Sequence, residues 1–229
     1  MKYKWLNKKN NNKLIIFFNG WGMDECVVNH LLTEDYDILM FYDYNSLNTD
    51  FDFKSIDIYS QKYLIAWSMG VMIATLFNNV NYDKKIAING TFKPIDDNYG
   101  IPKRIYNLTL KNFSQKGAEK FIKNMFDNSF LPHPDPLLKK RGESSEIESE
   151  FNFSNFLLQL NRDFENQKSE LEALTHYEAN PNFKYDKVIL SSNDKIIPTK
   201  NQAAFWNIKP NVEGGHAPFF NFSKWSDLL

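Results

Sequence analysis

Short runs rich in isoleucine, valine, leucine and phenylalanine recur along this chain, with room for helices between them. Four of these runs occupy residues 14–18, 37–42, 62–66 and 187–190. Continuous apolar runs of this length are typical of parallel strands that are buried on both faces. A fifth run, at 85–88, ends at Asn89-Gly90, and a sixth strand is expected before Gly214. The alternation predicts an α/β fold, with a mostly parallel sheet covered by helices on both faces.

The strand pattern stops between residues 94 and 181, where two helical patterns are separated by a polar stretch with three prolines. The first pattern places four apolar residues on one helix face: Phe121, Ile122, Met125 and Phe126. The second has five at helical spacing: Phe153, Phe156, Leu157, Leu160 and Phe164. We expect a flexible loop at 129–150. The sequence therefore predicts a core of residues 1–93 and 182–229, with 94–181 inserted as a helical cap.

The composition argues against several classes of function. A formal net charge of -1 argues against nucleic acid as the main ligand. The single cysteine, Cys26, excludes an internal disulfide framework and suits the cytoplasm. No apolar run approaches the length of a membrane span, so we expect a soluble, unprocessed monomer with no membrane partner. The sequence has no metal-ligand constellation, phosphate-binding loop or nicotinamide fingerprint, and we expect no metal and no cofactor.

One hydroxyl interrupts the third apolar run. Ser68 lies between this expected strand and an expected helix, within the stretch AWSMG at 66–70. In doubly wound folds, ligands and chemistry gather at the carboxyl ends of the strands. The stretch is a variant of the G-x-S-x-G nucleophile elbow, with alanine in place of the first glycine. On this motif alone, a serine that caps the following helix explains the residues equally well.

In this arrangement the acid and the base follow the serine along the chain, in that order. Asp194 comes after the expected strand at 187–190, in the stretch NDKIIP, and His216 lies in the stretch GGHAPF. An Asn-Asp pair is also ordinary turn chemistry. The order of the two residues and their positions after strands favour the catalytic interpretation.

The chain has four histidines, and elimination favours the same base. His30 is expected in a helix, four residues after Cys26, and this pair lacks a third group to orient it. An amphipathic helix with a buried cysteine explains that pair better. His133, in the proline-bearing stretch, and His176 are expected in solvent. His216 is therefore the predicted base.

The stretch NGWG, after the first run, predicts an oxyanion hole, although two glycines around one residue are also common in turns. Its glycines allow the Trp21 N–H to approach the serine, and the Met69 N–H is the second expected donor. Together the four stretches predict an acyl-transfer site. Ser68 would attack an ester carbonyl, His216 would act as general base and then acid, and Asp194 would fix the imidazole tautomer.

The stretches FFNGWGMD, AWSMG and GGHAPF resemble those of the BioG-type pimeloyl-[acyl-carrier protein] methyl ester esterases of biotin synthesis, in the α/β-hydrolase superfamily. The resemblance covers both ends of the chain and matches the expected cap in position and helical character. It implies the same five residue roles, as well as an inserted cap. It also implies the substrate, a seven-carbon acyl chain linked to an acyl-carrier protein, whose methyl ester is hydrolysed to carboxylate and methanol.

A cluster of basic side chains in the expected cap suits such a partner. Between residues 99 and 124 six basic residues face one acid, Glu119: Lys103, Arg104, Lys111, Lys116, Lys120 and Lys123. Acyl-carrier proteins are strongly acidic, so this surface, here called the basic face, is a candidate docking site. A lysine stripe opposite an apolar stripe is equally the solvated side of a helix. Trp21 and Trp67 could likewise line the acyl channel or simply pack.

Two other functions fit the same residues. One is a general short-chain acyl esterase or thioesterase with the same three catalytic residues. The other is a non-catalytic α/β-hydrolase-like binding protein, since one fold hosts many functions.

Overall fold

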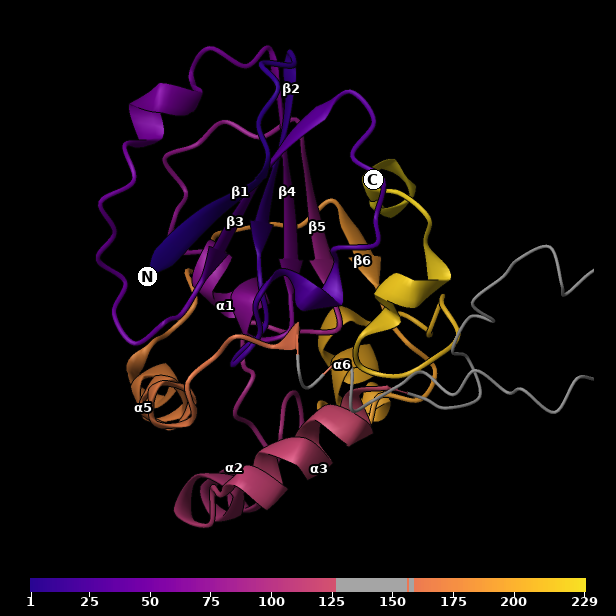
Figure 1. The fold of residues 1–229 in the computed structure, drawn as a ribbon. Helices are drawn as coiled ribbons and strands as arrows, with labels where there is room; N and C mark the ends of the chain where they lie inside the picture. Colours follow the sequence, from indigo (N-terminus) through magenta and orange to yellow (C-terminus); the bar gives the residue numbers. More distant parts are fainter. Residues whose placement is uncertain (127–155, 157–158) are drawn as a thin grey trace, which may run out of the picture.

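The computed structural model describes residues 1–126, 156 and 159–229 (Figure 1). The flexible loop expected at 129–150 lies outside the described residues, and so do His133, Phe153 and Leu157.

The described residues form a sheet of six strands in the order β1-β3-β2-β4-β5-β6 (Figure 1). The strands are β1 Lys2–Asn7, β2 Lys13–Phe18, β3 Tyr36–Tyr42, β4 Gln61–Trp67, β5 Lys84–Ile88 and β6 Lys187–Ile189. β1 pairs antiparallel with β3, and the remaining pairs are parallel. The mostly parallel sheet and its five expected strands are confirmed.

Two expectations about strands need correction. β1 was not anticipated, because its lysines mask an alternating pattern; the strand lies at the sheet edge, where lysines discourage pairing with other chains. The sixth strand expected before Gly214 is wrong. That segment forms only an isolated bridge, between Ser191 and Val212, and then turns toward the site.

Helices and 3-10 turns surround the sheet. The helices are α1 Met69–Ala74, α2 Lys103–Lys111, α3 Gln115–Met125, α5 Phe164–Ala173 and α6 Thr199–Trp206. The 3-10 turns include η1 Glu25–Val27, η2 Phe53–Ile56, η5 Leu174–His176, η6 Pro218–Asn221 and η7 Trp225–Leu228. Alternate β2 residues face opposite sides: Leu14, Ile16 and Phe18 join one buried cluster, and Ile15 and Phe17 join the other. The sheet is therefore covered on both faces, as predicted.

Two expected helices differ from the structure. Residues around His30 do not form a helix: after η1 the backbone of Leu32 pairs with the C-terminal segment at Ser223 and Trp225, which holds it extended. The helix expected to run to Phe164 is interrupted. Asp163 caps the N-terminus of α5, its carboxylate accepting from the Asn166 N–H at 2.8 Å, so Phe164 begins a separate helix.

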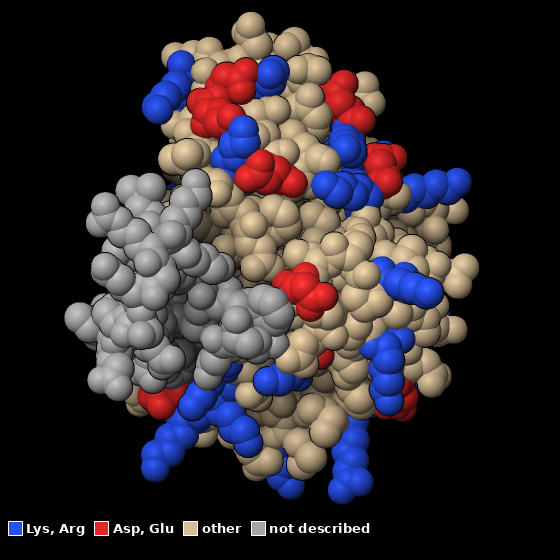
Figure 2. All heavy atoms as spheres, turned by 90° about the vertical axis from the view of Figure 1, so that its right-hand side faces the viewer, with Lys and Arg blue, Asp and Glu red and all other residues tan. Residues whose placement is uncertain are grey.

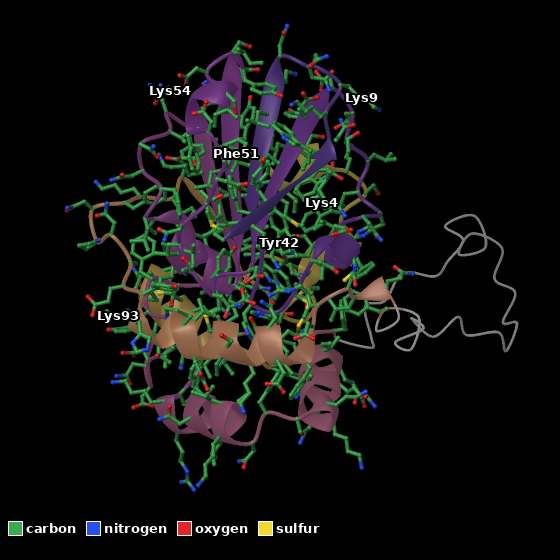
Figure 3. The ribbon with its side chains drawn as sticks, turned by 60° about the vertical axis from the view of Figure 1, so that its left-hand side comes forward. Lys4, Lys9, Tyr42, Phe51, Lys54 and Lys93 are labelled. Atoms are coloured by element: carbon green, nitrogen blue, oxygen red, sulfur yellow. The ribbon has the colours of Figure 1, made fainter. Side chains whose placement is uncertain are left out.

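Helices α2, α3 and α5 follow β5 in the chain, precede β6, and lie beyond the carboxyl ends of the parallel strands (Figure 1). α5 lies between the sheet and the α2–α3 pair (Figure 3). The Tyr106 hydroxyl of α2 donates to the Leu171 carbonyl of α5 at 2.6 Å, which ties the two layers together. These helices therefore stand over the edge of the sheet where Ser68 lies.

Candidate active site

Ser68 occupies a strained turn between β4 and α1. Its φ of 58° and ψ of -125° are rarely adopted by a residue with a side chain. A Cβ on Gly70 would lie 2.4 Å from the Phe18 carbonyl oxygen, and one on Gly90 would lie 2.3 Å from the Ser68 carbonyl oxygen, so both positions require glycine. The hydroxyl makes no capping bond to α1, which excludes the helix-cap interpretation.

The structure brings the three predicted catalytic side chains together in one hydrogen-bonded chain. His216 Nε2 lies 2.8 Å from Ser68 Oγ, and His216 Nδ1 lies 2.7 Å from Asp194 Oδ2. All three side chains are buried. In neutral imidazole with the proton on Nδ1, that N–H donates to the carboxylate and Nε2 accepts from the serine hydroxyl. This arrangement can remove a proton from Ser68 during attack.

Asp194 is held by more bonds than the one to His216. Its Oδ1 accepts from the backbone N–H groups of Ile196 at 2.8 Å and Ile197 at 3.0 Å. Its Oδ2 also accepts from the side chain of Gln202 in α6, at 2.7 Å. These donors fix the position of the carboxylate. Sequence reasoning missed Gln202, because it is one polar residue on an otherwise ordinary helix.

Asn89 and Trp67 fix the loop that carries His216. The Asn89 Nδ2 donates to the carbonyl oxygens of His216 at 2.9 Å and Gly215 at 3.2 Å, and the indole N–H of Trp67 donates to the His216 carbonyl at 2.8 Å. Asn89 has a φ of 42°, which asparagine tolerates better than most residues. Its position just after β5 was the signal that could have identified it, because site residues collect there.

The two predicted oxyanion donors remain available. Within the described part of the chain, the backbone N–H groups of Trp21 and Met69 donate to no protein acceptor. Met69 begins α1, where the first N–H groups have no partner in the helix. A Cβ built on Gly20 would lie 3.3 Å from the Ser68 Cβ, so the Trp21 loop passes directly beside the serine. Both donors can therefore face charge that develops near Ser68.

A cavity of about 420 Å³ opens beside Ser68. Its wall is mostly apolar and includes Trp21, Ile101, Tyr106, Phe113, Phe121 and Leu171. The Trp21 indole N–H donates to the Gln167 carbonyl at 2.8 Å, which turns the ring into this wall. Trp67 lies outside the cavity lining: its ring packs against Phe219, with the centroids 5.2 Å apart, and its indole N–H holds the His216 loop. The two tryptophans thus have different roles.

The six residues of the basic face are exposed on α2 and α3. None of their side chains is paired with a carboxylate among residues 1–126, 156 and 159–229. Lys120 also lines the cavity. Lysine and arginine side chains gather at the lower edge of the molecule in Figure 2, the height of α2 and α3 in Figure 1.

The other candidate nucleophile and bases lie elsewhere. Burial raises the pKa of the Cys26 thiol well above its usual range, so the thiol stays protonated. Burial also lowers the pKa of His30, whose Nε2 lies 3.1 Å from the Phe219 carbonyl oxygen. His176 is exposed, as expected.

Among the described residues we find no cluster of histidine, cysteine and carboxylate side chains suited to a metal ion. No described helix has the length and apolar character to cross a membrane.

The parallel sheet, the strained serine and its histidine and aspartate partners define an α/β-hydrolase. A lipase-esterase related protein from Clostridium acetobutylicum has this fold, with a TM-score of 0.59 at 13% identity over 96% of this chain and 92% of that one. The crystal structure of BioG from Haemophilus influenzae matches with a TM-score of 0.80 at 31% identity, over 100% of this chain and 99% of that one.

The family model for pimeloyl-ACP methyl esterase BioG matches residues 1–228, and the chain belongs to this family. An uncharacterized Haemophilus influenzae protein is 33% identical over 94% of this chain and 93% of its own length. A Bacteroides fragilis protein named malonyl-[acyl-carrier protein] O-methyltransferase is 35% identical over 84% of this chain, which spans only 36% of that protein. The chain is thus a carboxylic ester hydrolase of biotin synthesis.

Proposed function

We propose that Ser68 is the nucleophile that hydrolyses the methyl ester of pimeloyl-[acyl-carrier protein]. The observation that carries this assignment is the continuous chain of hydrogen bonds from Ser68 through His216 to Asp194, at the wall of an apolar cavity. Three buried polar groups in this geometry match the requirements of nucleophilic catalysis.

The reaction follows from these contacts in two steps. Ser68 Oγ attacks the ester carbonyl carbon while His216 Nε2 takes the hydroxyl proton, and the N–H groups of Trp21 and Met69 stabilise the oxyanion. His216 then donates the proton to the departing methoxide, which leaves as methanol. Water, deprotonated by His216, then attacks the acyl-enzyme, and His216 returns the proton to Ser68 Oγ as the acyl–oxygen bond breaks and the free carboxylate leaves. Asp194 holds the imidazole and stabilises its charged form throughout.

The cavity suits a long acyl chain that ends at Ser68. Its apolar wall extends from the buried serine to Ile105 and Leu108 of α2, which are 52% and 47% exposed. Methylene groups bind such a wall because they leave water. We propose that residues 94–181 form a cap over the core of residues 1–93 and 182–229. The acyl chain would pass beneath this cap, with its carrier outside.

The direct test compares two substrates for the purified protein. The carrier-linked pimeloyl methyl ester should be hydrolysed with a kcat/KM at least about 100-fold above that of a short nitrophenyl ester, since remote binding energy contributes to catalysis. Methanol release measures the first reaction and nitrophenolate absorbance the second. Equal values would instead support a general short-chain esterase or thioesterase.

We further propose that the basic face docks the acidic carrier. Reversing Lys111, Lys116 and Lys123, which are exposed and lie outside the cavity lining, to glutamate should lower kcat/KM for the carrier-linked ester on the order of 10-fold at low salt, because attraction becomes repulsion. Hydrolysis of the nitrophenyl ester should hardly change. Steady-state rates at two salt concentrations make the comparison.

The matched control reverses Lys8, Lys9 and Lys54, which are also exposed. Lys9 and Lys54 lie at the end of the molecule opposite α2 and α3 (Figure 3). If both triple variants behave alike, the basic face is simply the solvated side of the helices. A cytoplasmic location, a monomeric state and the lack of nucleic-acid and membrane partners stay predictions.

A further inference from the structure

A buried ion pair between Glu170 of α5 and Arg162, which precedes that helix, lies beside the loop that carries the Trp21 N–H. Arg162 and Glu170 are in contact at 2.6 Å, with side chains 3% and 0% exposed. The Arg162 guanidinium also lies over the ring of Tyr42, 5.6 Å from its centroid; Figure 3 labels Tyr42 near the end of the sheet that faces α5. Neither charged side chain has a hydrogen bond or ion pair with Ser68, His216 or Asp194, so the reaction steps above do not use them.

This ion pair holds the loop through its backbone. The Gly22 N–H, in the peptide unit that follows Trp21, donates to Glu170 Oε2 at 3.2 Å. Arg162 Nη1 donates to the Met23 carbonyl at 3.1 Å. Both charged groups are therefore bonded to the two residues that follow the oxyanion donor.

Two more side chains complete the attachment. Gln167 of α5 donates from its side-chain Nε2 to the Gly22 carbonyl at 3.0 Å, and the backbone carbonyl of Gln167 accepts from the Trp21 indole N–H. The other Glu170 oxygen accepts from the Tyr44 N–H at 2.8 Å, and the Tyr44 hydroxyl donates to the Asn19 carbonyl at 2.7 Å. The Trp21 N–H stays available, while the peptide groups around it are bonded.

The energetics favour a role in geometry over one in stability. Burial raises the pKa of Glu170, and Arg162 opposes that rise. A buried ion pair adds little net stability, because loss of hydration offsets the attraction. A carboxylate with both oxygens bonded to backbone N–H groups does, however, fix the positions of those groups closely. Displacing a catalytic donor by even about 1 Å can lower a rate on the order of 100-fold.

We propose that the Arg162–Glu170 pair, with Gln167, is a positioning device that holds the Trp21 N–H toward the oxyanion. The inference rests on the proposed role of Ser68 and adds a function for α5. The helix thereby couples the region above the cavity to the stabilisation of the transition state.

The test uses Glu170→Gln, which keeps the shape but removes the charge that pairs with Arg162 and places an N–H₂ group either opposite the Tyr44 N–H or opposite both the Gly22 N–H and Arg162. We expect kcat to fall about 10- to 100-fold with KM changed less than about threefold, because the lost interaction acts in the transition state. The affinity of an alkylboronic acid should fall by the same factor. Its tetrahedral adduct with Ser68 places an oxygen in the oxyanion hole.

Asp43→Asn is the matched control. Asp43 lies 3.9 Å from Arg162 and is buried in the same charged cluster, but has no hydrogen bond to residues 20–24. It should keep kcat and boronate affinity within about threefold of wild type. If Glu170→Gln and Asp43→Asn change kcat and boronate affinity equally, the ion pair acts only in stability and the proposal is overturned.

Gln167→Met is a second, uncharged variant that keeps the test decisive if Glu170→Gln does not fold. It removes the bond to the Gly22 carbonyl, and we expect a parallel loss of kcat and boronate affinity. Wild-type values for Gln167→Met would overturn the proposal. Boronate binding does not depend on which ester is the substrate, so this test remains distinct from the substrate comparison.

Discussion

Ser68→Ala is expected to lower ester turnover by about 10⁵- to 10⁶-fold, the largest loss of any single change in this protein. The replacement removes the atom that forms the acyl-enzyme and leaves His216 without a proton to accept. Alanine fits the same backbone, so the melting temperature should change little. Single-turnover and steady-state hydrolysis of the carrier-linked ester measure the loss.

Substrate binding should survive this change, because the apolar cavity and the loop around Trp21 are untouched. Ser55→Ala, at an exposed serine of η2, is the control and should keep wild-type turnover. Residual turnover of Ser68→Ala above about 1% of wild type would mean that another group performs the attack.

Asp194→Asn is expected to lower kcat by about 10⁴-fold through the imidazole tautomer. If the new amide group faces His216, two donors oppose each other at Nδ1, and the ring must carry its proton on Nε2. It can then no longer accept the Ser68 proton. If the amide turns the other way, its N–H₂ meets the N–H groups of Ile196 and Ile197.

Either arrangement of the amide disturbs catalysis more than it disturbs folding. We therefore expect a large loss of kcat with only a small decrease in the melting temperature. Thermal unfolding and kcat are measured on the same preparation. Asp186→Asn, at a surface carboxylate that accepts from the Lys85 N–H, controls for loss of one charge. A fall in kcat of less than about 10-fold would contradict the assigned role of Asp194.

The apolar runs and short motifs of the sequence were enough to predict the sheet and the positions of the reacting groups. Continuous apolar runs identified the five parallel strands, because strands buried on both faces carry no polar alternation. Ser68 and Asp194 could be identified because each follows a strand and the fold brings those ends together. His216 could be identified from its place after the acid in the chain and by elimination among the four histidines. The structure places the three in contact, and their catalytic roles stay predictions until the variants are measured.

The features that the sequence did not predict depend on contacts between segments far apart in the chain. The region around His30 lacks its expected helix because Leu32 pairs with the C-terminal segment. Asn89 and Gln202 support His216 and Asp194 from other elements, through single polar side chains with no motif. The hydrogen bond from Gly22 to Glu170 joins residues 148 positions apart, and the sequence around neither residue indicates it.

The measurement that bears most directly on the central claim is mass spectrometry after reaction with a fluorophosphonate, which phosphonylates an activated serine. We predict one covalent group on the wild-type protein, located on the peptide that contains Ser68, and none on folded Ser68→Ala. Folded wild-type protein that stays unlabelled, or that carries the group on a different serine, would contradict the assignment of Ser68 as the nucleophile.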